Sequence, residues 1–279
     1  SGSTMSYTDA PDAQERMRSF LQLCAAHEVP CSSFQLSSGY TSIGTKRYVF
    51  NWNRDKFPDP AAFAAEFAAA GLMLAANIKP CLLTDHPLYG ECREAGLFLG
   101  ESGAAGEGDS TPPPETSMFW DAVGSHLDFT NPATAAWWRA QVREKLLDLG
   151  IGSTWNDNNE WRVEDESAVC HGFGTPTPLR LVRPVQALLM VRASLEAQRA
   201  HAPTLRPWLI SRSGMPGTQR YAQTWSGDNY TSWHTLKHNV RMGLGLSLSG
   251  FFNTGHDVGG FAGPAPEPEL FVRWVQNGV

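Results

Sequence analysis

Helix-like and strand-like segments alternate along this chain, and that alternation constrains its fold more than any other feature. The segment "FPDPAAFAAEFAAAG" has Asp59 in N-cap position, Pro60 at the first helical position and Gly71 after its end. The apolar run "LMLAANI" follows it. The segment "NPATAAWWRAQVREKLLDLG" repeats the scheme, with Asn131 as cap and Gly150 as stop, before "IGSTWND". Strands that alternate with helices predict an α/β fold with a parallel sheet.

Three further helix–strand pairs extend this rhythm. Residues 9–28 have helical spacing and precede "VPCSSFQLSS", residues 179–200 form a long helix before "PWLISRS", and "TSWHTLKHNVRMGLGLSLSG" precedes "FFNTGHDVGG". Two arrangements fit, an eight-fold barrel or an open doubly wound sheet. Polar residues gather where the strand-like runs end: Ser37, Ser38, Lys79, Asp157, Arg212, Asp228 and Asp257. A barrel brings all strand ends to one mouth, so we predict a (β/α)8 TIM barrel.

The whole chain, 1–279, is predicted to be one catalytic barrel domain. Two segments interrupt the rhythm and are expected to be loops or insertions, 100–116 and 161–178. The first is rich in Gly, Pro and acidic residues. The second follows the strand that carries Asp157, and long loops in compact domains often form lids or rims of functional sites.

Composition excludes several classes of protein. The net charge is −6, and no run of Lys or Arg indicates a nucleic-acid partner. No apolar run is long enough to span a bilayer, and the first residues lack a signal-peptide pattern. The five cysteines have no paired spacing typical of disulfides or of zinc. We therefore expect a cytoplasmic location, with a periplasmic or secreted one as the alternative if a signal peptide lies outside this chain.

Two carboxylates stand out in similar surroundings. Asp157 follows an apolar strand in "STWNDNNEWR", and Asp228 follows Trp225 in "TWSGDNY". Two carboxylates with aromatic walls at a barrel mouth suit acid–base or nucleophilic chemistry on a sugar. Carboxylates beside Asn and Arg212 also occur in purely structural hydrogen-bond networks and in cation sites, so the residues alone leave these interpretations open.

Five motifs, in order and over nearly the whole chain, resemble those of glycoside hydrolase family 31. "GIGSTWNDNNEW" resembles the nucleophile stretch DG-x-W-x-D-M-N-E-P, and "LISRSGMPGTQRYAQTWSGDNYTSW" resembles RS…G…RYA…W-x-GDN. "FNTGHDVGGF" is similar to GADIGGF, "VFNWNRDKFPDP" to F-x-W-x-x-x-x-FPDP, and "LDFTNPATAAWW" to vDFTNP…WW. The resemblance implies a (β/α)8 barrel and a retaining α-glycosidase, in a family that also holds transglycosylases and lyases.

The resemblance also implies roles for individual residues. Asp157 would be the nucleophile that forms a covalent glycosyl-enzyme, and Asp228 would be the acid/base. The other candidates are substrate-binding or site-orienting residues: Arg212, Asp257, Trp155, Trp225, Glu160, Trp52 and His256. For His256 a structural role is an equal alternative. As the acid, Asp228 would have to carry a proton that it can give to the leaving oxygen. No cofactor and no metal are implied.

The chain departs from the family pattern at several positions. Trp161 replaces the usual Pro and Asn158 the common Met. Ser37 or Ser38 stands where many members have an Asp that binds outer sugar hydroxyls. That Asp suits the equatorial 4-hydroxyl of glucose, so α-galactosidase or α-N-acetylgalactosaminidase specificity is an alternative. Lys79 stands where the family has an acidic or neutral residue, and it could meet an anionic or polar substituent.

The resemblance predicts a partial chain, without the eighth strand and the flanking β-domains. The predicted function is a retaining α-glycoside hydrolase, α-glucosidase-like, that cleaves a terminal α-linked sugar from an oligosaccharide or glycoconjugate. The alternatives are an α-transglycosylase and a truncated barrel that binds sugar without turnover. A homo-oligomer is compatible with the sequence, whereas a nucleic-acid partner and a membrane span are not expected.

Overall fold

A parallel sheet curled into a half-barrel organises the chain. The structure is a computed structural model and describes residues 2–103 and 112–278. Within these residues the sheet has seven strands in the order β1-β2-β5-β9-β12-β13-β14, and all neighbouring pairs are parallel. The strands are β1 (Gly2–Ser3), β2 (Ser33–Leu36), β5 (Met73–Ile78), β9 (Ser153–Asn156), β12 (Leu209–Ser211), β13 (Gln223–Trp225) and β14 (Thr254–Gly255).

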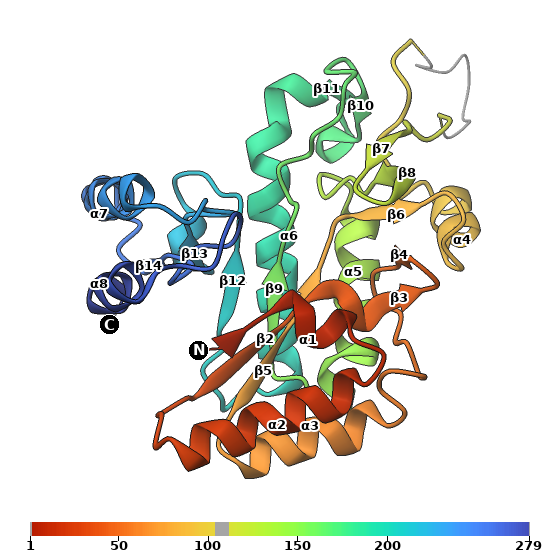
Figure 1. Ribbon diagram of the computed structural model, residues 1–279. Helices are drawn as coiled ribbons and strands as arrows, with labels where there is room; N and C mark the ends of the chain where they lie inside the picture. The colour runs from red at the N-terminus through yellow and green to blue at the C-terminus, as the bar shows by residue number, and fades with distance from the viewer. Residues whose placement is uncertain (1, 104–111, 279) are drawn as a thin grey trace.

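The described residues form the helices α1 (Met5–Asp9), α2 (Ala13–Ala26), α3 (Pro60–Ala69), α4 (Tyr89–Glu94), α5 (Pro132–Lys145), α6 (Leu179–His201), α7 (Trp233–Leu248) and α8 (Pro268–Gly278). Helices α2, α3, α5 and α6 pack on the outer face of the sheet, whereas α4 lies beside β6 (Cys81–Leu83) (Figure 1). Short 3₁₀ turns add η1 (Ser38–Thr41), η2 (Leu147–Leu149), η3 (Gly172–Gly174) and η4 (Thr218–Arg220). The predicted α/β barrel fold is confirmed, and strand order follows chain order as it does in TIM barrels.

The predicted helix ends follow from local capping chemistry. The Asp59 side chain accepts a hydrogen bond from the Ala62 backbone N–H, and Asn131 accepts one from Ala133 N–H. Both helices then start with a proline, which lacks the N–H that a first turn cannot use. Gly150 adopts φ 87°, a left-handed conformation that ends the second helical segment at low steric cost.

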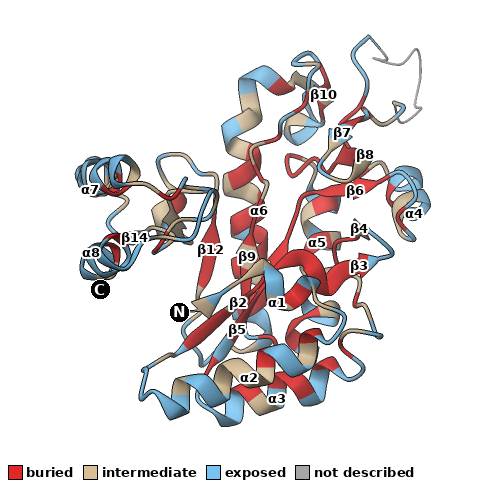
Figure 2. Ribbon diagram, viewed as in Figure 1, coloured by how far each residue is buried: buried red, intermediate tan, exposed pale blue. Residues whose placement is uncertain are grey.

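The main core lies between the sheet and the helices α2, α3, α5 and α6. Phe34, Phe63, Phe67 and Trp138 are among its fully buried large side chains. In Figure 2 the buried residues concentrate on the strands β2, β5, β9 and β12, whereas α7 and α8 are exposed along much of their length. The strands that position the site therefore belong to the best-packed part of the molecule.

Small antiparallel sheets lie at the mouth of the half-barrel, and no sequence pattern predicted them. One consists of β6 (Cys81–Leu83), β8 (Ala122–His126) and β7 (Ser117–Phe119). A second small sheet consists of β3 (Ser42–Ile43) and β4 (Lys46–Arg47), and a third consists of β10 (Val169–Cys170) and β11 (Thr177–Pro178). The last pair lies in the expected loop 161–178. Of the expected loop 100–116, residues 104–111 lie outside the described residues.

No helix among the described residues is both long enough and apolar enough to cross a membrane.

Candidate active site

The register of three neighbouring strands builds the centre of the site. The last residues of β5, β9 and β12 are aligned across the sheet. The residues that come next in the chain therefore emerge side by side at the carboxyl ends of these strands, and they are Lys79, Asp157 and Arg212. Carboxyl strand ends are where TIM barrels place their reactive groups.

Asp157 is buried and held by charged and polar neighbours. Its Oδ2 accepts hydrogen bonds from Asn77 Nδ2 and Lys79 Nζ, both at 2.9 Å. The Arg212 Nη1 lies 3.2 Å from Oδ1 as an ion pair, although no aligned hydrogen bond reaches that oxygen within the described residues. Burial alone would raise the pKa of Asp157, but the charges of Lys79 and Arg212 and the bond from Asn77 outweigh it. The net pKa is lowered, so the carboxylate is ionised at neutral pH.

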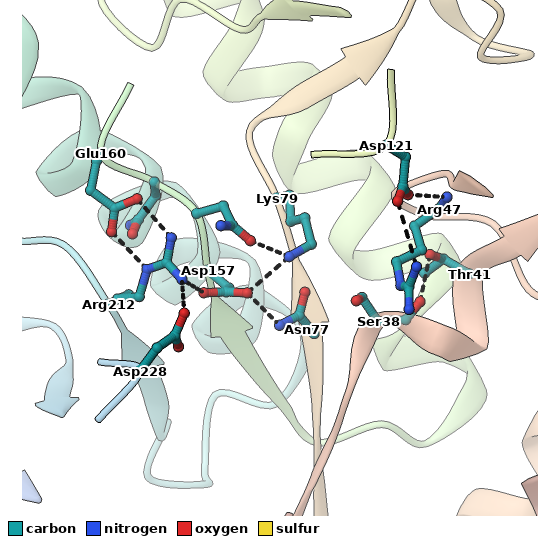
Figure 3. A network of polar contacts seen from close by, with 12 residues as sticks. Ser38, Thr41, Arg47, Asn77, Lys79, Asp121, Asp157, Glu160, Arg212 and Asp228 are labelled. Atoms are coloured by element: carbon teal, nitrogen blue, oxygen red, sulfur yellow. Dashed lines mark hydrogen bonds and ion pairs between the residues drawn. The ribbon is translucent and has the colours of Figure 1, made fainter. Parts of the chain in front are cut away.

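Arg212 connects three carboxylates (Figure 3). Its Nε and Nη2 donate to the two oxygens of Glu160 at 2.7 and 2.9 Å, a bidentate pair. Its Nη1 lies 3.2 Å from Asp157 Oδ1 and 3.7 Å from Asp228 Oδ2. These two oxygens are therefore at most about 7 Å apart, a limit that includes the roughly 5–5.5 Å of retaining glycosidases. The predicted orienting role of Glu160 has a physical basis in this pair.

A cavity of about 470 Å³ lies beside Asp228, inside the half-barrel. Its lining includes four more of the predicted site residues: Trp155, Trp225, His256 and Asp257. The rings of the two tryptophans meet edge to face, with centroids 5.8 Å apart. Flat aromatic walls beside carboxylates suit the apolar faces and hydroxyl edges of a sugar ring.

Asp257 titrates near neutrality. Burial, together with the negative charges of Asp228 and Asp157, raises the pKa of Asp257 from 3.8 to about 7. At neutral pH its carboxyl group is divided between the protonated form, which donates a hydrogen bond, and the ionised form, which only accepts. Burial also lowers the pKa of His256, which keeps its ring neutral.

The raised pKa of Asp257 predicts a pH-dependent gain in stability for Asp257→Asn. The folded chain binds a proton between pH 3.8 and about 7 that the unfolded chain has released, so this group makes the fold less stable as pH rises through that window. The variant should therefore gain stability over the wild type as pH rises from 4 to 8, by at most about 4 kcal/mol. Urea unfolding at both pH values measures this. An equal gain at both would contradict it.

Two predicted residues lie in the wall of the mouth, and one lies elsewhere. Ser37 and Ser38 are buried, and Ser38 lines a small gap together with Lys79 and Arg47. Trp52, by contrast, is packed in the core, where its Nε1 donates to the Lys145 carbonyl at 2.8 Å. We correct its assignment: Trp52 is a packing residue. The family motif identifies the position of Trp52 in the chain, but a motif does not determine the direction of the side chain.

The polar run after β9 divides into reactive and structural residues. Asn156 and Asn159 are fully buried and tie β9 to β12: Asn156 donates to the Ile210 carbonyl at 3.1 Å and Asn159 to Ser211 Oγ at 2.9 Å. Asn158 accepts from Lys79. Trp161, in the place of the family's Pro, is fully buried and donates to the Leu127 carbonyl at 3.0 Å.

Two contacts of the site were missed from the sequence. Asn77 sits inside the apolar run "LMLAANI", and a lone amide in a buried strand is a signal that could have been used. Trp120, at the turn of the β7–β8 hairpin, lies with its ring centroid 4.5 Å from Lys79 Nζ and 4.3 Å from the Arg47 guanidinium carbon. Its side chain is half exposed, and no local pattern points to this position.

No group of three or more His, Cys, Asp or Glu side chains within residues 2–103 and 112–278 is placed to hold a metal ion.

The half-barrel with paired carboxylates at its mouth defines the chain as a glycosidase-like TIM barrel. The family model of the glycosyl hydrolases family 31 TIM-barrel domain matches residues 2–279. The chain therefore belongs to glycoside hydrolase family 31, and the resemblance found in its motifs is confirmed.

Curated relatives carry α-glucosidase names. The chain is 31% identical to human "Neutral alpha-glucosidase AB" over 99% of this chain and 29% of the relative. It is 28% identical to "Alpha-glucosidase 2" of Bacillus thermoamyloliquefaciens, over 96% of this chain and 33% of the relative. The chain thus spans about a third of the length of these relatives.

Solved structures share the fold. A glucosidase II alpha subunit matches with a TM-score of 0.82 at 24% identity, covering 95% of this chain and 28% of that one. The GH31 dextranase of Flavobacterium johnsoniae also gives 0.82, at 19% identity, over 95% of this chain and 33% of the dextranase. At these identities the likeness supports the barrel fold and not the substrate.

Proposed function

We propose that this chain carries the catalytic centre of a retaining α-glycosidase that removes a terminal α-linked sugar. One observation carries the proposal: Arg212 Nη1 lies between the carboxylates of Asp157 and Asp228, beside a cavity walled by Trp155 and Trp225. Membership of family 31 supports the same reaction class.

The first step follows from the surroundings of the two carboxylates. An oxygen of Asp157, ionised because of its cationic neighbours, would attack the anomeric carbon. The bond from that carbon to the leaving oxygen breaks, and its electron pair takes the proton of Asp228. Asp228 is exposed at the mouth, with about half of its side chain in contact with solvent, so it can reach a leaving group of any size.

The second step reverses these roles. Water attacks the anomeric carbon, gives its proton to the Asp228 carboxylate, and releases Asp157 as a carboxylate. Two inversions at one carbon leave the sugar in its original α configuration. Asp257 and His256, in the cavity lining, would bind hydroxyl groups of the sugar.

Proton NMR of the protein with nitrophenyl α-glycosides tests this proposal. The panel should contain glucose, galactose, xylose and N-acetylgalactosamine, because Ser37 and Ser38 leave the sugar identity open. We expect early release of the α-anomer from one member of the panel. Early appearance of the β-anomer would overturn the retaining mechanism, and transfer to a second sugar in a sugar-rich mixture would identify a transglycosylase.

A further inference from the structure

Lys79 is an unusual neighbour for a nucleophilic carboxylate. It is 7% exposed, and its Nζ donates to Asp157 Oδ2 at 2.9 Å. Within residues 2–103 and 112–278 Asp157 is its only carboxylate partner. Its other contacts are the uncharged amide oxygen of Asn158 and the ring of Trp120. The ammonium group therefore depends on one buried negative charge.

That negative charge disappears during the proposed reaction. When an Asp157 oxygen bonds to the anomeric carbon, the carboxylate becomes a neutral ester, whichever of its oxygens attacks. The compensating charge appears on Asp228, which has given its proton to the leaving group. Asp228 faces Arg212 at 3.7 Å, and the charges that act on Lys79 are those of Asp157, Arg212 and Arg47. The new carboxylate thus stabilises Arg212 and not Lys79.

The other cations nearby keep their partners throughout. Arg212 retains the bidentate pair with Glu160 at 2.7 Å, and Arg47 retains Asp9 at 2.9 Å and Asp121 at 3.6 Å. Burial lowers the pKa of Lys79, the Asp157 carboxylate opposes this shift, and both arginines add to it. In the glycosyl-enzyme, Lys79 would be a desolvated cation among cations, which is costly.

We propose that Lys79 is a positioning residue that destabilises the covalent glycosyl-enzyme relative to the free carboxylate, so that the intermediate breaks down faster than it forms. The inference rests on the proposed function, because it requires an ester at Asp157. Its physical basis is that an ammonium hydrogen-bonded to the departing carboxylate makes Asp157 a better leaving group while it makes Asp157 a weaker nucleophile.

Lys79→Met tests the inference, because methionine keeps much of the length of the side chain and removes the charge. The substrate is the nitrophenyl α-glycoside that the wild type hydrolyses. The wild type should release nitrophenol without a burst. The variant should show a burst close to one equivalent per site, a kcat lowered by about tenfold or more, and a much smaller change in kcat/KM, since breakdown becomes rate-limiting. Intact-mass spectrometry should detect the sugar adduct on the variant during turnover.

Arg47→Met is the matched control. Arg47 shares the Trp120 ring with Lys79, has the smallest of the charge effects on Lys79, and is paired with Asp9 and Asp121, so its loss should produce no burst and no adduct. Lys79→Gln, which keeps a hydrogen-bond donor without the charge, is the second variant if Lys79→Met does not fold. It should also show the burst, because the charge and not the hydrogen bond is responsible.

The outcomes separate the two proposals. A 5-fluoroglycosyl fluoride of the same sugar should label Asp157 in the wild type, and the label should be lost more slowly from Lys79→Met. If Asp157 is labelled but the label leaves the wild type and Lys79→Met at the same rate, the role of Lys79 alone is overturned. The same holds if kcat and kcat/KM of Lys79→Met fall equally and no burst is seen. Turnover by the wild type without any label on Asp157 would overturn the proposed function and this inference together.

Discussion

Asp157→Asn is expected to lower kcat/KM on the nitrophenyl glycoside by at least about 10⁴-fold, because it removes the nucleophile while its shape is kept. The amide can still accept hydrogen bonds from Asn77 and Lys79, so the local geometry should survive. The measurement is the initial rate of nitrophenol release at saturating and at low substrate. Retention of more than about one-hundredth of the wild-type kcat/KM would contradict the nucleophile assignment.

Azide rescue provides the matched pair of controls for this assignment. In Asp157→Ala, azide can occupy the space of the carboxylate and attack the substrate directly, which should yield the β-glycosyl azide. In Asp228→Ala, azide should instead attack the glycosyl-enzyme from the face where water normally enters, which should yield the α-glycosyl azide. Product NMR distinguishes the two. An exchange of these anomers between the variants would reverse the roles of the two residues.

Arg212→Met is expected to destabilise the fold as well as to abolish activity. The Arg212 side chain is 17% exposed and its guanidinium contacts Asp157, Glu160 and Asp228, so its removal takes a cation from the buried Asp157 and the bidentate partner from Glu160. Breaking a buried pair in this way costs about 3–5 kcal/mol. Urea unfolding at neutral pH measures the loss, which should be smaller at acidic pH where the carboxylates become protonated.

Adding Glu160→Gln to Arg212→Met tests whether the uncompensated charges cause the loss of stability. The double variant should recover part of the lost stability, because one of the uncompensated negative charges is gone. It should recover no activity, since Asp157 and Asp228 still lack the shared cation. A double variant that is less stable than Arg212→Met would show that Glu160 contributes by packing and not through its charge.

Much of the fold follows from local patterns. The caps Asp59 and Asn131, each followed by a proline, locate the starts of α3 and α5 because capping acts over a few residues. Gly71 marks the end of α3, whereas α5 ends at Lys145 and Gly150 ends the 3₁₀ turn η2 that follows it. Other elements have no such signal. The strands β6, β7 and β8 are three to five residues long, too short for a periodic pattern to reveal them. The strands β7 and β8 form a local hairpin, but the pairing of β6 with β8 joins segments about 40 residues apart, which no local pattern predicts.

The candidate site also has one part that the sequence predicts and one part that only the tertiary structure shows. The sequence by itself determined which residues stand at strand ends, among them Lys79, Asp157 and Arg212, because apolar runs and their polar successors are local features. Only the tertiary structure decided their partners: Lys79 meets Asp157 from 78 residues away, and Trp52 turns into the core. The physical reason is strand register, since the alignment of β5, β9 and β12 depends on long-range packing that no short segment encodes.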